Sequence, residues 1–185
     1  MAQGIFLRNL LHFSLQYSIL LIDGRAQFLG RWQEMFDWNN LQHYKETNRI
    51  EAKQAVGGLP RSIWETYSAF ANSDGGVILL GVAERKTDKT LYAVDLPDPW
   101  RLVAQFWEMV NDPRIVSKNI LRKEDVQVEQ TEGKEIVVIY VPKADKKDKP
   151  IYIGGNRETG AYYRRGESDI RIPKARLDKM LKEAE

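Results

Sequence analysis

Between residues 50 and 80, the apolar and polar positions change from a strand pattern to a helix pattern and back. Residues 50–53 alternate between apolar and charged side chains, which predicts a strand with one charged face and one apolar face. Gly57-Gly58 ends this strand, and apolar residues then recur at helical spacing. Residues 77–80 form a short apolar run, which is typical of a strand buried on both faces. The segment therefore predicts a strand, a helix and a buried strand in succession.

Turn and capping signals indicate where this helix begins and ends. Pro60 suits the first helical position, because its missing N–H is not needed there. Ser62 and Glu65 have the spacing of a capping box. Residues 72–76 (Asn-Ser-Asp-Gly-Gly) end the helix and allow a sharp turn. We expect the apolar stripe to comprise Ile63, Tyr67, Phe70 and Ala71, and the centre of the core to comprise Trp64, Phe70 and residues 77–80.

The rest of the chain predicts further strands and two more helices. The fold class is α+β, with a mixed sheet and about three helices. A Thr-Glu-Gly turn joins two of the strands, and Gly154-Gly155-Asn156 lies between two others. We expect strands at 90–94, 126–129, 135–141, 150–153 and 161–164, the last two paired with each other, and helices at 100–110 and 173–184.

Composition excludes several kinds of chemistry. The chain has 185 residues, 43% of them hydrophobic and 29% charged, as in an ordinary globular protein. It has no cysteine, which excludes disulfides, zinc–thiolate sites and thiol catalysis and fits a cytoplasmic protein. His12 and His43 are the only histidines, which argues against a serine triad or a His-rich metal site. Neither Gly57-Gly58 nor Gly75-Gly76 is followed by Gly-Lys-Ser/Thr, so no P-loop supports ATP hydrolysis.

Residues 1–40 form an atypical N-terminal extension, separate from a domain at residues 41–185. Residues 11–19 alternate between apolar and polar side chains, and Asp23-Gly24 follows, which suggests a β-hairpin. Arg8 and other polar residues interrupt the apolar stretch, so we expect no membrane span. A basic leader region and a cleavage motif of a secretory signal are missing. An added strand, an interaction arm and a poorly ordered extension all fit this segment.

Basic residues suggest a surface that contacts nucleic acid. Residues 142–185 hold twelve Lys and Arg against eight Asp and Glu, partly in a mixed-charge run at 143–149 that predicts a solvated loop. In the run 162–166 (Tyr-Tyr-Arg-Arg-Gly), aromatic rings could stack on bases and guanidinium groups could hold phosphates. A strand with one buried tyrosine and solvated arginines explains the same run. Under the first interpretation, one concave basic face comprises Lys53, Arg61, Tyr163, Arg164 and Arg165.

The run EAK…GGLPRSIWETYSAFANSDGGVILLGV resembles the Schlafen AlbA-type domain, and the resemblance continues through KPIYIGGN and GAYYRRGESD to about Arg171. This family is described as DNA-binding and is found in bacterial proteins predicted to regulate transcription and in helicase-related proteins. The resemblance implies a single Schlafen-like lobe that binds nucleic acid, DNA rather than RNA, without a cofactor. Schlafen cores resemble two joined lobes, so two copies of this chain could form a homodimer. A purely structural dimerisation module is a further alternative.

The resemblance also suggests a nuclease as an alternative. Nuclease-active Schlafen proteins carry two glutamates around the first strand and an aspartate after Gly-Val, where they support a divalent metal. Glu46 and Glu51 match in type and spacing, whereas the third position is Glu84 at best and follows Ala83. The implied activity is Mg²⁺- or Mn²⁺-dependent cleavage of structured RNA such as tRNA. Glu51-Ala52-Lys53 also has the Glu-x-Lys form of metal-dependent nucleases, although a surface salt bridge on one strand face is the favoured explanation of that pair.

Overall fold

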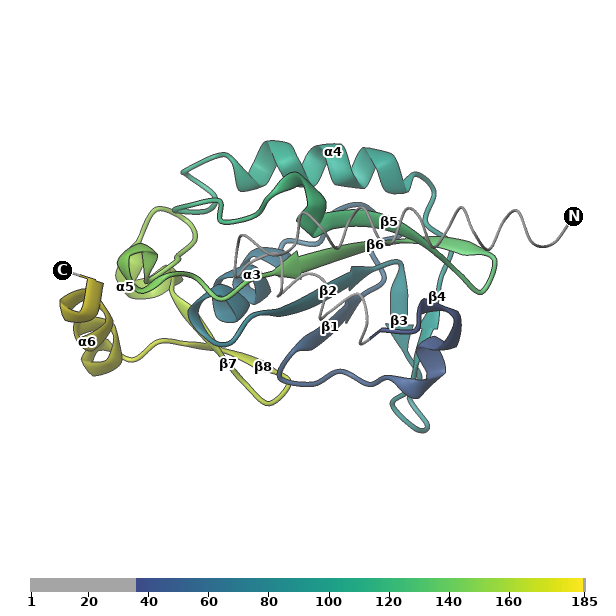
Figure 1. Ribbon diagram of the computed structural model, residues 1–185, viewed down its shortest axis with the longest axis horizontal. Coiled ribbons are helices and arrows are strands. Elements are labelled where there is room, and N and C mark those ends of the chain that lie inside the picture. The colour runs from purple at the N-terminus through teal and green to yellow at the C-terminus, as the bar shows by residue number, and fades with distance from the viewer. Residues whose placement is uncertain (1–35, 185) are drawn as a thin grey trace, which may run out of the picture. The chain divides into compact units, whose positions relative to one another are not determined.

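A mixed four-stranded sheet lies at the centre of the fold (Figure 1). The computed structural model describes residues 36–184, and the predictions for residues 1–35 lie outside this range. The strand order is β1-β2-β6-β5, with β1 and β2 parallel and the other neighbours antiparallel. The strands span Ile50–Lys53 (β1), Gly76–Leu80 (β2), Val126–Thr131 (β5) and Lys134–Val141 (β6).

Helix α3 (Ile63–Asn72) connects the two parallel strands, as the sequence pattern predicts. The predicted capping box is wrong, because Ser62 makes no side-chain capping hydrogen bond. Ser62 has helical backbone angles (φ −66°, ψ −9°), whereas a capping side chain needs an extended backbone. Pro60 lies in the turn before the helix, where its carbonyl accepts a hydrogen bond from Ile63 N at 3.0 Å.

The predicted core is confirmed on the face of the sheet that α3 and α4 (Pro99–Val110) cover. Trp64 stacks on Phe106 of α4 with 5.4 Å between the ring centres, and Phe70 is fully buried. Strand β2 is buried along its whole length, which confirms a strand covered on both faces. A side chain at Gly76 would meet the Phe70 ring at 2.8 Å, so only glycine lets the strand start this close to the helix. Asp98 caps the N-terminus of α4, and its carboxylate accepts a hydrogen bond from Arg101 N.

Two small antiparallel ribbons flank the sheet. Strand β3 (Val82–Glu84) pairs with β4 (Leu91–Ala93), and β7 (Tyr162–Arg165) pairs with β8 (Ser168–Arg171). The predicted pairing of 150–153 with 161–164 is reduced to one bridge, between Tyr152 and Ala161. The physical reason is the short turn at Gly166, whose φ of 60° lets the chain fold directly from β7 into β8.

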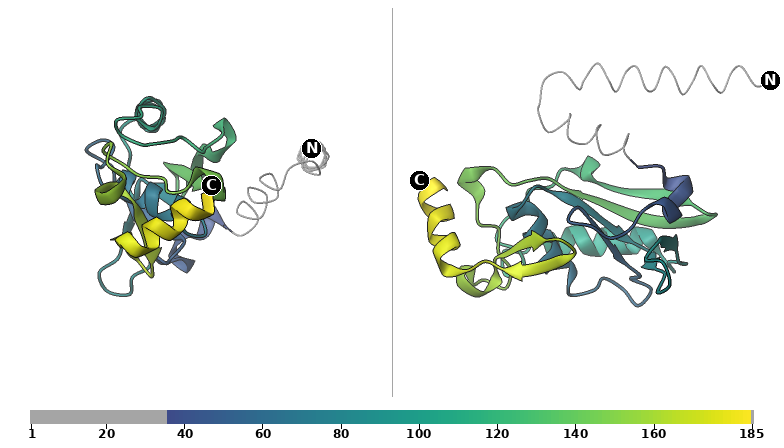
Figure 2. Two further views of the ribbon diagram at one scale, coloured as in Figure 1. Left: turned by 90° about the vertical axis from the view of Figure 1, so that its left-hand side faces the viewer. Right: turned by 90° about the horizontal axis from the view of Figure 1, so that it is seen from below.

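The described part of the chain has four α-helices, one more than the sequence predicts. The additional helix is the single turn α5 (Arg157–Gly160), which is too short to show a periodic pattern. Helix α6 (Lys174–Ala184) lies at one end of this part (Figure 2) and buries Leu177. Three short 3₁₀ helices complete the order: η1 (Trp38–His43), η2 (Lys123–Asp125) and η3 (Lys146–Asp148). Within residues 36–184, no helix has the length and apolarity needed to cross a membrane.

Candidate nucleic-acid interface

Two polar side chains of α3 attach the β7–β8 ribbon to the helix. Asn72 Nδ2 donates to the carbonyl oxygens of Ile151 (2.7 Å) and Tyr162 (2.9 Å), and its Oδ1 accepts from Ile151 N (2.8 Å). One turn earlier, Ser68 Oγ accepts from Tyr162 N at 3.0 Å. Because the two side chains are four residues apart, they lie on the same face of the helix. Nothing in the hydrophobic pattern marks them, yet they determine where the ribbon lies.

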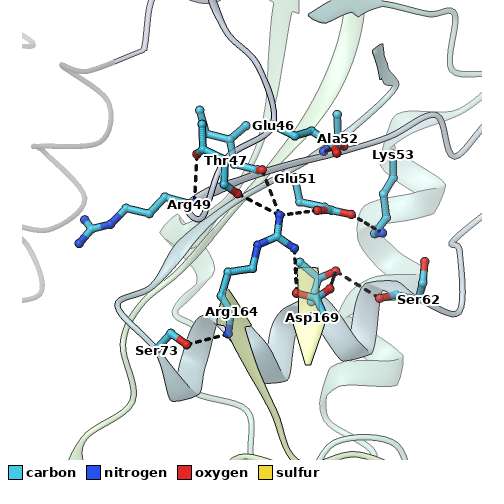
Figure 3. A network of polar contacts seen from close by, with 12 residues as sticks. Glu46, Thr47, Arg49, Glu51, Ala52, Lys53, Ser62, Ser73, Arg164 and Asp169 are labelled. Carbon is cyan, nitrogen blue, oxygen red and sulfur yellow. Dashed lines mark hydrogen bonds and ion pairs between the residues drawn. The ribbon is translucent and has the colours of Figure 1, made fainter. Parts of the chain in front are cut away.

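The ribbon carries Arg164 into the interior of the protein (Figure 3). Its side chain is 1% exposed, and it forms ion pairs with Glu51 (2.7 Å) and Asp169 (2.8 Å). The guanidinium also donates to the Thr47 carbonyl at 3.0 Å and lies 5.1 Å from the centre of the Phe70 ring. The expectation that Arg164 contacts phosphate on a basic surface is therefore wrong. Its charge is used inside the fold, where a buried cation needs opposite charges and hydrogen-bond acceptors.

Hydrogen bonds from outside the sheet cover the free edge of β1. Glu46 Oε1 accepts from Ala52 N at 3.0 Å. The Ile50 carbonyl accepts from Thr47 N at 3.0 Å and from Arg164 at 3.4 Å. An edge strand whose backbone groups are already paired offers little to a second strand, so this edge is protected against strand addition.

The three carboxylates predicted as a nuclease site lie within electrostatic reach of one another around Glu46. Burial raises the pKa of Glu46 above its ordinary value, while the hydrogen bond from Ala52 N lowers it. The negative charges of Glu51 and Glu84 then raise the pKa of Glu46 further. The sequence thus identifies three acids that the fold brings to one region, although they come from different elements.

Side-chain cations pair with two of these three carboxylates, Glu51 and Glu84. Glu51 binds Lys53 through Oε1 (2.9 Å) and Arg164 through Oε2, and Glu84 Oε1 binds Lys89 at 2.7 Å. In the described part of the chain, no three His, Asp or Glu side chains are grouped so that they could hold a metal ion. The Glu51–Lys53 pair is a salt bridge on one strand face, with its side chains only 13% and 12% exposed.

The remaining residues of the predicted basic face differ in their exposure. Arg61, before α3, and Arg165, at the end of β7, are exposed. Tyr163 is half-buried, with the Arg176 guanidinium 4.2 Å from its ring centre. Lys53 is largely buried in its salt bridge. Successive side chains of a strand point to opposite faces, which is why Arg165 reaches solvent while its neighbour does not.

Asp169 and Thr66, which the sequence patterns did not indicate, complete this region. Thr66 Oγ1 donates to Asp169 Oδ2 at 2.7 Å, and the other carboxylate oxygen binds Arg164. This contact joins the first turn of α3 to β8 across 103 residues of sequence. A signal was available in the period-two pattern, because Arg164 and Asp169 are direct cross-strand neighbours once the Gly166 turn is recognised.

Comparisons with known proteins give the family. A family model described as Schlafen, AlbA_2 matches residues 46–173. The chain is similar to the N-terminal domain of a Nitrosomonas europaea protein named as related to the ATP-dependent DNA helicase RecG, with 37% identity and a TM-score of 0.54 over 73% of this chain and 90% of that one. A Corynebacterium diphtheriae protein, 16% identical with a TM-score of 0.54, shares the fold over 86% of this chain and 29% of its own. No match was found among curated proteins. The chain therefore belongs to the Schlafen AlbA_2 family.

Proposed function

We propose that this domain is a nucleic-acid-binding module that binds DNA as part of a transcriptional regulator or helicase-related protein. The observation that carries the proposal is the match to the Schlafen AlbA_2 family over residues 46–173. The 37% identical N-terminal domain of a helicase-related protein supports it. The best-defined charged network, around Arg164, holds the elements of the domain together. This fits a binding module that contacts its partner through other residues.

Arg61 and Arg165 are the residues of the predicted basic face that we propose to contact phosphate. Both are exposed, and they flank elements that the Thr66–Asp169 hydrogen bond joins. Arg165 is directly opposite Ser168 in the ribbon, one residue from Asp169. Guanidinium groups in this position could bind phosphate oxygens with two parallel hydrogen bonds. Tyr163 and Lys53 would support this face from partly buried positions.

The test is the salt dependence of binding to fluorescently labelled duplex DNA and structured RNA. The Arg61→Ala/Arg165→Ala double variant should weaken binding and lower the slope of log K against log salt by about two, because each arginine neutralises one phosphate. The Arg114→Ala/Lys123→Ala variant, which removes two other exposed cations, is the matched control. A wild-type chain that binds neither nucleic acid would contradict the module, and tighter binding to RNA would contradict the DNA assignment.

A metal-dependent endoribonuclease is a second candidate, because Glu46, Glu51 and Glu84 lie within electrostatic reach of one another. A metal would have to displace the cations that pair with Glu51 and Glu84. Incubation of the purified chain with tRNA and Mg²⁺ or Mn²⁺ tests it. Glu84→Gln is a better diagnostic variant than Glu51→Gln, because Glu84 forms its ion pair with the exposed Lys89, whereas Glu51 holds the buried Arg164. Cleavage that requires metal and is abolished in Glu84→Gln would favour the nuclease, while intact tRNA would favour binding alone.

We also propose that the chain forms a homodimer, following the two-lobed form of Schlafen cores. The protected edge of β1 implies that such a dimer would use another surface. Light scattering of the full chain over a range of concentrations tests the proposal. A molecular mass that stays at the monomer value throughout would exclude the dimer.

A further inference from the structure

Three basic residues lie near the C-terminal end of α3. Lys143, which follows β6, binds Asp74 with 2.9 Å between Nζ and Oδ1, and both side chains are well exposed (58% and 60%). Lys149 Nζ donates to the carbonyl oxygen of Asn72 at 3.0 Å. Arg176 of α6 lies over the Tyr163 ring. We call these three residues the α3-end cluster: Lys143, Lys149 and Arg176.

The positive charges of this cluster exceed the negative charges near them. The pKa of Lys149 is lowered to about 8, chiefly by burial and then by the charges of Lys143 and Arg176, while Asp74 and Glu183 oppose this shift. Asp74 in turn has a lowered pKa, first through the hydrogen bond from Lys143 and then through the charges of Lys143, Arg49 and Lys149. Lys143, Lys149 and Arg176 thus lie near two carboxylates, Asp74 and Glu183, and Glu183 also pairs with Lys179. The cations repel one another.

The fold gains little from the exposed cations of the cluster. Lys149 caps the C-terminal end of α3, where carbonyl oxygens carry partial negative charge. Lys143 and Arg176, by contrast, are exposed. Exposed ion pairs contribute little to stability, so the Lys143–Asp74 pair gives no strong reason to gather these charges. A group of surface cations that repel one another favours an anion as its partner.

We propose that the α3-end cluster binds a backbone phosphate of nucleic acid. The inference rests on the proposed function and adds contacts beyond Arg61 and Arg165, with Arg176 lying over Tyr163 of that face. Lys143 and Arg176 would donate hydrogen bonds to the phosphate oxygens, and Lys149 would lie behind them as a partly buried charge. Because the bound phosphate reduces the repulsion among the cations, binding is strongest when all of them are protonated.

The experiment measures how the Lys143→Ala/Arg176→Ala variant binds labelled duplex DNA and structured RNA at several salt concentrations. Affinity should fall for every sequence, and the slope of log K against log salt should fall by about two. The Arg114→Ala/Lys123→Ala control should bind like the wild type. Because both cluster side chains are exposed, thermal melting of the variant should stay close to wild type.

Each other outcome decides against a specific claim. A wild-type chain that binds, with a variant that keeps the same affinity and slope, overturns the cluster and leaves the proposed function standing. No binding by the wild type overturns both. In a separate arm, inorganic phosphate is added to the wild type and the variant. Phosphate that raises the melting temperature only of the wild type, combined with unchanged oligonucleotide binding by the variant, would make the cluster a site for the free anion instead.

A pH titration gives a second readout. Lys149 faces Lys143, Asp74, Arg176 and Glu183, and it loses its proton as the pH rises through its pKa of about 8. Affinity for DNA should therefore fall as the pH rises through this value, both in the wild type and in the Arg114→Ala/Lys123→Ala control, which keeps Lys149. Lys149→Arg keeps its charge over this range and should not show that decrease. An identical pH dependence in wild type and Lys149→Arg would exclude Lys149 from the site.

Discussion

The network around Arg164 and the α3-end cluster both gather charges from distant parts of the chain, but they differ in balance and exposure. In the first, Arg164 and Lys53 face Glu51 and Asp169, so that positive and negative charges match. In the second, Lys143, Lys149 and Arg176 lie near two carboxylates, Asp74 and Glu183, and Glu183 also pairs with Lys179. The difference follows from solvation. A buried charge without a partner costs several kcal/mol, whereas water stabilises an exposed one.

The comparison separates residues that stabilise the domain from residues that are available to a partner. Arg164 is 1% exposed and Lys143 is 58% exposed. Replacing a residue of the balanced network should therefore change the free energy of unfolding, and replacing one of the cluster should change binding instead. Substitutions at the two regions and between them test that division.

The largest effect is expected from Arg164→Ala. This change leaves Asp169 partly buried without its cation and Glu51 paired with Lys53 alone, so the free energy of unfolding should fall by about 3–5 kcal/mol. Urea denaturation measures it. Arg165→Ala, one residue away and exposed, is the matched control and should change stability by less than about 0.5 kcal/mol. Equal stability of the two variants would mean that the network does not support the fold.

A smaller effect is expected from Asn72→Ala, which lies between the two regions. The Asn72 side chain holds the ribbon that carries Arg164, and the Asn72 backbone carbonyl accepts a hydrogen bond from Lys149 Nζ. The substitution leaves the backbone groups of Ile151 and the Tyr162 carbonyl without the Asn72 side chain as partner, at a cost of about 1–3 kcal/mol. Hydrogen exchange should show faster exchange in β7 and β8. Wild-type protection there would contradict the role assigned to Asn72.

The smallest effect is the change with pH in the contribution of Lys149 to the free energy of unfolding. Lys149 in the folded chain has a pKa of about 8, whereas an unfolded lysine keeps its proton to about pH 10.5. Between these values the unfolded state binds more protons, so this group makes the folded state more stable as the pH rises. Unfolding of wild type and Lys149→Gln across this pH range measures the difference. The difference in unfolding free energy between wild type and Lys149→Gln should shift in favour of wild type as the pH rises. A difference that stays constant would contradict the lowered pKa and the charge repulsion assigned to Lys149.

The sequence predicts the elements around α3 well, because their patterns are local. The strand–helix–buried strand order and the core at Trp64 and Phe70 follow from periodicity and turn residues. The charged regions were harder to predict. In the ribbon, the alternating pattern allows either Arg164 or Arg165 to point inward, and only contacts across 113 residues, to Glu51, decide which one does. The α3-end cluster brings residues on both sides of η3 and one residue of α6 to the end of α3, and no motif within one segment indicates it.

The most direct test of this division is the salt dependence of duplex DNA binding by wild type and Lys143→Ala/Arg176→Ala, between about 50 and 200 mM salt. We predict that the wild-type affinity falls steeply with salt, and that the variant binds more weakly with a slope lower by about two while it melts like the wild type. A variant that binds with the wild-type affinity and slope would contradict the division, because the unbalanced cations would then have no part in binding.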